Sequence, residues 1–433
     1  MTKNFWLLCS LILGLILVGL FAVNNGPILL AIPLLIYLGF AIANQPSEPL
    51  LKTSRELSTH DTSWGKPVEV KVNVTNQGKP LEEIYLQDYV RGSRSLNINQ
   101  GFLTKRLCLE EGETTSLDYI VSGERGRYKF EGVQVKYCEF FGLFESVRFL
   151  PAHTQLSIFP VITPVRSIRI HPRQTRGFAG PILARQGGAG TDFYGVREYQ
   201  LGDPMRRINW KISSRYPQSV FTNESEQERI ADVGIILDAR QQCDISTIHG
   251  SLFEHSVNAA ASLADSFLRD GHRVGLYIYG YSVERVFPGY GKIQRENILR
   301  ALSRAHTGIN FALENLSFLS SRFFPSKTQL VMISPLKPED LSPLVRLHSL
   351  GYEMLIVSPD PVHFEAIKYH REKFPEVDLA LRMAIIERTL LIRRLKRAGI
   401  DVIDWRVEYS LDQVVSRAIR RHSAGDRILQ IGL

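Results

Sequence analysis

The segment ADVGIILDAR, residues 231–240, decides the fold of the C-terminal half of the chain. Its apolar centre, Val233–Leu237, is typical of a strand that is covered on both faces of a parallel sheet. Further strands are expected at 273–279, 329–334, 354–358 and 402–405, and helices at 252–269, 294–306, 339–349, 377–397 and 411–421. This alternation predicts a doubly wound α/β domain over residues 226–433, with functional residues at the carboxyl ends of its strands.

Toward the N-terminus, residues 51–165 are expected to form only β-structure. Val68, Val70, Val72 and Val74 alternate with polar residues, which indicates a half-buried strand. Other strands are expected at 84–90, 114–121, 127–136 and 145–149, separated by turns that contain glycine. This spacing predicts an immunoglobulin-like sandwich. Residues 166–225 are expected to be a connector to the α/β domain, with short extended pieces.

Residues 1–50 are predicted to be a two-helix membrane anchor. The run Phe5–Val23 is long enough to cross a hydrocarbon core of about 30 Å. The run Ile28–Ala43 is shorter and contains Pro33, so it spans a bilayer only with help such as local thinning. A secretory signal peptide is the alternative for the first run. It is disfavoured because no small-residue cleavage site closes that run and a second apolar run follows.

The charges around the anchor predict its orientation. Lys3, Lys52 and Arg55 flank the hairpin, whereas its connecting turn carries no charge. By the positive-inside rule, both ends then lie inside, which predicts a two-pass protein of the cell membrane with cytoplasmic soluble domains. The net charge of +8 is dispersed over the chain without a nucleic-acid motif. The expected nonprotein partner is therefore the lipid bilayer and not nucleic acid.

The segment GTDFYGVREYQLGDPMRRINWKISSR, residues 190–215, carries the densest chemistry of the chain. Asp203 and Pro204 are expected to open a helix, with Asp203 as its cap, and Arg206 and Trp210 would then share one face. The favoured interpretation is a buried cluster of the tryptophan with ion pairs. Its predicted acids are Asp192, Glu198 and Asp203, and its predicted arginines are Arg197, Arg206 and Arg215. The alternative is an arginine-lined site for a carboxylate or phosphate group.

This segment resembles the signature of the family called "domain of unknown function 58". The residues that carry the resemblance are Asp192, Phe193, Arg197, Tyr199, Gly202, Asp203, Arg206, Arg207, Ile208, Trp210, Ser214 and Arg215. Asp192 stands where the family usually has Glu, and Arg206 and Arg207 both remain candidates for one family arginine. Two further matches are Gly126–Tyr128 and Phe141–Phe144. The resemblance implies two membrane spans, a β-sandwich and a domain similar to von Willebrand factor A.

That last domain usually holds a divalent ion at the end of its first strand, on Asp-x-Ser-x-Ser, a threonine and a second aspartate. In this chain Asp238 is kept, but Arg240 and Gln242 replace the two serines. Ile309 stands near the place of the threonine, and Ser334-Pro335 near that of the second aspartate. We therefore expect no metal and no cofactor, with Arg240 pairing with Asp238 in place of the ion.

The sequence contains no Gly-x-Ser-x-Gly, phosphate loop or His-Glu-x-x-His motif. Cys243, followed by His249 and His255, is a weak candidate for a nucleophile. We therefore predict a non-enzymatic adaptor that binds another protein through the α/β domain. The family resemblance implies work with a MoxR-type AAA+ ATPase in assembly or maturation of other proteins. The alternative is an enzyme or anion-binding protein that uses the Arg/Asp cluster at 192–215: an open cleft there would favour it, and buried pairing would favour the adaptor.

Overall fold

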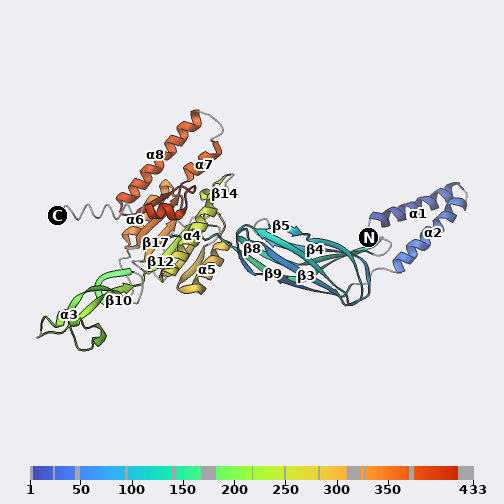
Figure 1. The fold of residues 1–433 in the computed structure, drawn as a ribbon. Helices are drawn as coiled ribbons and strands as arrows, with labels where there is room; N and C mark the ends of the chain where they lie inside the picture. The colour runs from blue at the N-terminus through green and yellow to red at the C-terminus, as the bar shows by residue number, and fades with distance from the viewer. Residues whose placement is uncertain are drawn as a thin grey trace. The chain divides into compact units, whose positions relative to one another are not determined.

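The computed structural model describes residues 3–22, 25–43, 49–92, 96–138, 143–166, 182–216, 218–247, 250–280, 283–309, 323–325, 328–369 and 375–417. Figure 1 shows the order of the elements along the chain. The chain divides into two compact units, Met1–Phe159 and Pro160–Leu433. The finer division at residues 50, 165 and 225 remains a prediction.

Two apolar helices begin the first unit, α1 (Lys3–Ala22) and α2 (Asn25–Ala43). Both are long and apolar enough to cross a membrane. Because α2 starts at Asn25 and continues through Pro33, its 19 residues span about 28 Å, close to the thickness of a hydrocarbon core. Large apolar side chains such as Trp6, Leu7 and Phe21 are exposed on the hairpin. Such a surface is unfavourable in water and is compatible with a membrane anchor.

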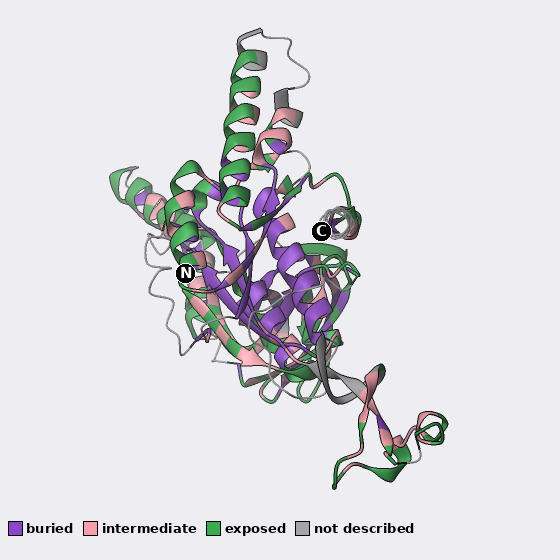
Figure 2. Cartoon of the chain, turned by 90° about the vertical axis from the view of Figure 1, so that its left-hand side faces the viewer, coloured by how far each residue is buried: buried purple, intermediate pink, exposed green. Residues whose placement is uncertain are grey.

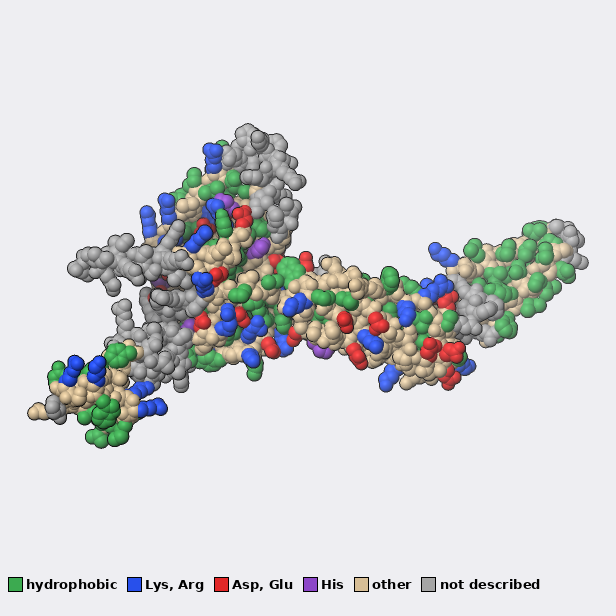
Figure 3. All heavy atoms as spheres, viewed as in Figure 1, with side chains coloured by type: hydrophobic (Ala, Val, Ile, Leu, Met, Phe, Trp, Pro, Cys, Tyr) green, Lys and Arg blue, Asp and Glu red, His purple; other side chains and the backbone are tan. Residues whose placement is uncertain are grey.

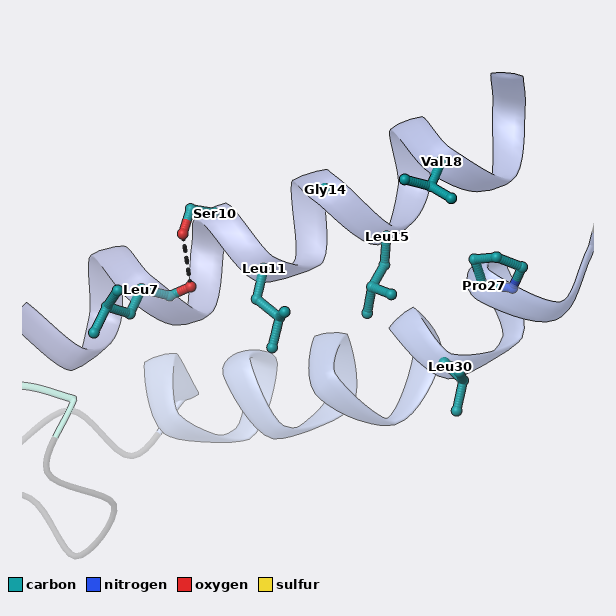
Figure 4. Close-up of a pocket in the computed structure, with 8 residues that line it drawn as sticks. All are labelled: Leu7, Ser10, Leu11, Gly14, Leu15, Val18, Pro27 and Leu30. Carbon is teal, nitrogen blue, oxygen red and sulfur yellow. Dashed lines mark hydrogen bonds between the residues drawn. The ribbon is translucent and has the colours of Figure 1, made fainter. Parts of the chain in front are cut away.

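The groove between α1 and α2 is almost entirely apolar (Figure 4). Its lining residues are Leu7, Ser10, Leu11, Gly14, Leu15, Val18, Pro27 and Leu30. The one hydroxyl among them, on Ser10, donates a hydrogen bond of 2.8 Å to the carbonyl oxygen of Leu7 in its own helix. The groove therefore presents hydrocarbon to its surroundings, as a helix pair in a bilayer does.

The rest of the first unit consists of two β-sheets around one core. One sheet has the order β1-β3-β7-β5 and the other β2-β9-β8-β4-β6. The strands are β1 (Leu51–Leu57), β2 (Asp61–Ser63), β3 (Val68–Asn76), β4 (Leu81–Gly92), β5 (Leu96–Gly101), β6 (Thr104–Leu109), β7 (Thr114–Gly123), β8 (Gly126–Cys138) and β9 (Glu145–Phe159). Val70 and Val72 of β3 are buried together with Leu86 of β4 and Val135 of β8, so side chains of both sheets meet in this core.

The prediction for this region needs two corrections. The strand expected at 145–149 continues to Phe159, and β1, β2, β5 and β6 were not predicted. Arg55, counted above as a charge that flanks the anchor, lies in β1 with its side chain buried against Asp88. Tyr119 donates a hydrogen bond of 2.5 Å to the same carboxylate. Arg55 therefore has a structural role in the sandwich core.

The second unit contains a mixed six-stranded sheet of order β16-β15-β12-β17-β18-β19. All neighbours are parallel except β15 and β16, which are antiparallel. The strands are β12 (Asp232–Asp238), β15 (Arg273–Tyr279), β16 (Glu284–Gly289), β17 (Gln329–Ile333), β18 (Glu353–Pro359) and β19 (Asp401–Trp405). After its first residue β12 is buried throughout, as its apolar run predicted.

Helices alternate with these strands and cover the sheet (Figures 1 and 2). They are α4 (Leu252–Arg269), α5 (Gly291–Arg304), α6 (Leu341–Ser349), α7 (Pro361–Tyr369) and α8 (Pro375–Arg397), and residues 411–417 are also helical. Leu347 of α6 and Leu395 of α8 are buried in one core with Met332 of β17. The predicted alternation is confirmed, while β16 and α7 were missed.

Candidate functional site

The signature lies on a two-stranded antiparallel ribbon of β10 (Ile182–Glu198) and β11 (Phe221–Arg229). The region expected to be a connector is therefore partly a β-hairpin. Between its strands lie a single 3-10 turn, η1 (Met205–Arg207), and a one-turn helix, α3 (Trp210–Ser213). The amide of Tyr199 donates to the carbonyl oxygen of Val220 at 2.7 Å, which closes the base of this loop.

Asn209, which the sequence analysis did not single out, fixes the start of α3. Its side-chain oxygen accepts a hydrogen bond of 3.1 Å from the amide of Ile212, as a helix cap does. Its side-chain nitrogen donates to Asn223 of β11 at 2.7 Å. Asn209 therefore couples the short helix to the ribbon, and a polar residue just before Trp210 was the signal that sequence reasoning could have used.

Asp203 is paired with Arg197, which is one of the predicted combinations of acid and arginine. The guanidinium donates to both carboxylate oxygens, at 2.7 and 2.8 Å, and Arg197 also lies 3.5 Å from Glu224. The amide of Gln200 adds a bond of 2.9 Å to Asp203. The hydrogen bonds from Arg197, followed by that from Gln200, hold the pKa of Asp203 below its ordinary value.

The prediction that Asp203 caps a helix is wrong. The residue before η1 is Pro204, and no side chain caps that turn. Asp203 instead closes the turn that Gly202 makes with a φ of 109°, a conformation that favours glycine. Arg206 and Trp210 also do not share one helix, because Ile208 between them is extended, with a ψ of 127°.

The interpretation of the signature as a buried tryptophan cluster is wrong as well. Trp210 is 69% exposed, and no residue of η1 or α3 is buried. Other exposed apolar residues of the loop and its strand are Phe193, Leu201, Met205, Tyr216 and Val220. The reason is architectural: a two-stranded ribbon offers no second layer against which the loop could pack. Asp192 lies in β10, and its side chain is outside the described part.

Basic side chains stand among these apolar ones. Arg206, Lys211 and Arg215 are exposed and Arg207 is half-buried. Among the residues that the structure describes, Arg206, Arg207 and Arg215 form no ion pair, although acidic partners were predicted for Arg206 and Arg215. Figure 3 shows blue and green side chains next to one another on this hairpin. The loop thus presents a mixed apolar and cationic surface, here called the signature surface: Leu201, Met205, Arg206, Trp210, Lys211 and Arg215.

A second cluster lies at the carboxyl end of β12 and contains the degenerate metal position. Arg240 donates to Asp238 from Nε and from one terminal nitrogen, at 3.0 and 2.8 Å. It also donates to both carboxylate oxygens of Asp340, at 2.9 and 2.8 Å. Ser334, at the end of β17, donates to Asp238 at 2.7 Å. One guanidinium therefore joins two carboxylates, and the predicted pair of Arg240 with Asp238 is present.

The Arg240 cluster is buried: the side chain of Arg240 is 6% exposed and both carboxylates are 0% exposed. Burial alone would lower the pKa of Arg240, but its hydrogen bonds with Asp238 and Asp340 outweigh burial and raise it. Burial raises the pKa of Asp340 despite the bonds from Arg240. The ring of Tyr279 lies 5.9 Å from the guanidinium carbon, a further favourable contact for the cation.

Asp340 was missed by sequence reasoning, which looked for an aspartate directly after β17. The chain instead turns through Leu336, which has a φ of 61°, and reaches Asp340 at the end of a short 3-10 turn, η4 (Pro338–Asp340). The amide of Lys337 donates to Asp340 at 2.9 Å and fixes this turn. An acid within one turn of a Pro-Glu-Asp helix start was the available signal.

The groups around Asp238 are hydrogen-bond donors, and one of them, the guanidinium of Arg240, is a cation that the protein itself supplies. Its carboxylate accepts from the guanidinium and the backbone amide of Arg240, from the hydroxyl of Ser334 and from the thiol of Cys243, 3.3 Å away. Arginine cannot ligate a metal ion. Among the described residues, no group of three or more His, Cys, Asp and Glu side chains is arranged to hold a metal. Ile309 is exposed, and Gln242 accepts from Lys337 at 2.6 Å.

Cys243 has the properties of a structural thiol. It is buried, and burial followed by the charge of Asp238 raises its pKa, so the thiol is protonated at neutral pH. His255 stacks edge-on against Phe364 and Trp405, with ring centres 5.8 and 6.5 Å away. His249 lies outside the described residues. This geometry does not activate Cys243 as a nucleophile.

Comparison with known proteins gives one family and one curated relative. The family described as "Protein of unknown function DUF58" matches residues 195–360, a range that contains Arg197, Trp210, Arg240 and Asp340. The "Uncharacterized protein YeaD" of Bacillus subtilis (strain 168) is 27% identical over 284 residues, which cover 64% of this chain and 67% of that protein.

Two solved structures that are similar to this chain each match about a quarter of it. The CARDB domain of the PF1109 protein from Pyrococcus furiosus is 16% identical, with a TM-score of 0.19, over 25% of this chain and 93% of that chain. The FixG-related protein from Vibrio parahaemolyticus is 11% identical, with a TM-score of 0.17, over 26% of this chain and 98% of that chain. At these TM-scores the similarity does not indicate a shared fold or function.

Proposed function

We propose that this chain is a non-enzymatic, membrane-anchored adaptor whose signature surface binds a partner protein. The observation that carries the proposal is the exposure of Trp210 together with Leu201, Met205 and Arg206. Large apolar side chains are costly to leave in water, and aromatic residues, methionine and arginine are enriched where proteins meet. A loop that packed for stability alone would bury these side chains.

The folds of the two units also support a binding function. Numbered in chain order within the six-stranded sheet of the second unit, its strands lie as 3-2-1-4-5-6, and the third is antiparallel to its neighbour. This arrangement supports a domain similar to von Willebrand factor A, and two sheets around one core support an immunoglobulin-like sandwich in the first unit. Both are folds on which binding sites are built from loops.

The partner that we propose is a MoxR-type AAA+ ATPase, with a role in assembly or maturation of other proteins. The support is the resemblance of the signature to a family that is linked with such ATPases. The partner's surface would have to be acidic where it meets Arg206, Lys211 and Arg215, and it would need an apolar pocket at its centre for Trp210. Lys3 and Lys52 support a cytoplasmic position, where ATP is present.

An enzyme or anion-binding protein remains the second candidate. Arg206, Arg207 and Arg215 are without an ion-pair partner among the described residues, so they are available to an oxyanion. However, Arg197 and Asp203 already satisfy each other, and the loop surface is exposed and carries as many apolar as basic side chains. The loop does not show the buried pairing that was to favour the adaptor, so the adaptor rests instead on the exposed apolar side chains, which an anion site does not require.

The test is binding of a purified MoxR-type ATPase to the full-length chain in lipid nanodiscs. The variant Met205→Ala/Trp210→Ala should weaken binding at least tenfold and leave the melting temperature unchanged. Ile293→Ala, which truncates an equally exposed apolar side chain on α5, is the matched control and should bind as the parent does. Unchanged affinity of the double variant would refute the assignment of the signature surface.

A further inference from the structure

Helix α8 is apolar on two opposite sides. On one side Leu391, Ile392 and Leu395 are buried against the sheet. On the other side four large apolar residues are exposed: Leu379 (62%), Met383 (55%), Ile386 (58%) and Leu390 (45%). Figure 1 shows α8 extending beyond the sheet, and in Figure 2 the same helix is exposed along most of its length. A helix that covers a core normally has a polar outer side, so the exposed stripe needs its own explanation.

The spacing of the stripe is that of a coiled-coil seam. Its members follow one another by four, three and four residues. At about 100° per residue they fall within an arc of about 60°, about 180° from the buried side. In heptad terms they occupy positions d, a, d and a. Arg393 takes the next d position, so the apolar seam ends after two heptads.

The charges beside the seam indicate what covers it. Arg382 and Glu387 are both exposed. In this register Arg382 occupies a g position, and Glu387 occupies the e position of the following heptad. In a parallel pair of identical helices, g of one helix lies next to that e position of the other, so Arg382 would meet Glu387 twice by symmetry. In an antiparallel pair Arg382 would lie near Thr389, and Glu387 near Ala380. Such pairs add little affinity but select the orientation.

We propose that a second copy of this chain covers the stripe, so that two α8 helices form a short parallel coiled coil. The seam Leu379, Met383, Ile386 and Leu390 is self-complementary, as a two-fold interface requires. Because it contains only two heptads, the dimer is reversible and depends on protein concentration. This inference concerns a surface other than the signature surface and does not rest on the function proposed above.

Cysteine cross-linking of the full-length chain in detergent tests the geometry. Leu379→Cys and Leu390→Cys are introduced separately after replacing Cys9 and Cys108, the described free cysteines that are not buried, with serine. A parallel pair places each new cysteine beside its own counterpart, so each single variant forms a covalent dimer under mild oxidation. Ile293→Cys on α5, where the parent side chain is more exposed than Leu379 or Leu390, should form none. Cross-linking only in a mixture of the two variants would show an antiparallel pair and overturn the proposal.

Sedimentation over a concentration series tests the energetics. Ile386→Ala should weaken dimerisation on the order of 100-fold, because both copies lose a buried side chain. Arg382→Glu and Glu387→Arg should each weaken it, and the two changes together should restore it. All these side chains are exposed, so the variants should keep the melting temperature of the parent. A parent chain that stays monomeric, or a dimer that Ile386→Ala does not weaken, would refute the proposed pairing of α8. Lipid or another protein would then be the candidate to cover the stripe.

Discussion

Replacing Arg240 with methionine should be one of the most damaging single changes in the second unit. The guanidinium donates to Asp238 and Asp340, whose side chains are both 0% exposed. Methionine fills a similar volume but leaves two buried carboxylates without a counter-charge. Removing one partner of a buried ion pair costs about 3–5 kcal/mol, a large part of the roughly 5–15 kcal/mol that stabilises a typical domain.

The loss should depend on pH with a definite sign. Without Arg240, the buried carboxylate of Asp340 should have a folded-state pKa still further above that in the unfolded chain. The folded variant then binds more protons than the unfolded one, so its unfolding free energy falls as pH rises. In the parent, burial already raises the pKa of Asp340, and the same trend is present but weaker because Arg240 opposes it. The difference between variant and parent should therefore be larger at pH 8 than at pH 5.

Hydrogen exchange of peptides from β12 and β17 measures this free energy locally, in the full-length chain. The control is Arg304→Met on α5, which removes a partly exposed pair with Glu284 and should cost less than about 1 kcal/mol. Adding Asp340→Leu to Arg240→Met should recover part of the loss, because the second unpaired charge is then gone. A loss below about 1 kcal/mol that does not change with pH would refute the electrostatic account.

Four other results are expected. Trp210→Ala should change stability by less than about 1 kcal/mol, measured by thermal unfolding, because its side chain is exposed; a loss of about 3–5 kcal/mol would mean burial. Gly234→Ala should cost about 1–3 kcal/mol, because a Cβ there would lie 2.6 Å from the ring of Phe324, whereas Gly195→Ala, with open space, should be neutral in the same assay. Protease added outside sealed cells should leave residues 51–433 intact, and digestion would refute the cytoplasmic position. Calorimetry of the full chain with Mg²⁺, Ca²⁺ and Mn²⁺ should show no micromolar binding, and binding that Asp238→Ala abolishes would contradict the assignment of Arg240 as the cation.

The elements that sequence predicted best are those with a strong local signal. Residues 252–269 and 273–279 form α4 and β15 with the predicted bounds. Both are buried almost throughout, and Ser251 caps α4 by accepting a hydrogen bond of 3.1 Å from Phe253. Strands such as β11 and β5 were missed because their sequences, FTNESEQER and LNINQG, are polar. A strand with such a polar sequence has no alternation of apolar and polar residues to detect, so its pairing with a neighbouring strand cannot be read from local sequence.

The candidate sites were predicted less well, for a different physical reason. The pair of Arg240 with Asp238 joins residues two positions apart, and a spacing argument can find such a pair. Asp340 reaches the same guanidinium from 100 residues away, through a turn whose path depends on tertiary packing. For Trp210 burial was predicted from a helix face shared with Arg206 and from a cluster of ion pairs around it, and the structure forms neither. A side chain is buried only where the fold supplies a second layer to cover it, and this is a property of the whole fold. The ribbon that carries Trp210 has no such layer among the described residues.

For the adaptor function proposed above, Arg240 in the place of a metal ion limits how partner binding can be controlled. A divalent ion can leave or change its ligands, so a site that holds one can couple partner binding to metal concentration. A guanidinium is covalently attached and keeps its charge at every physiological pH. The carboxyl end of β12 is therefore expected to stay in one state. Partner binding at this end of the α/β domain, through fixed side chains such as Asp238 and Arg240, should then survive a chelator.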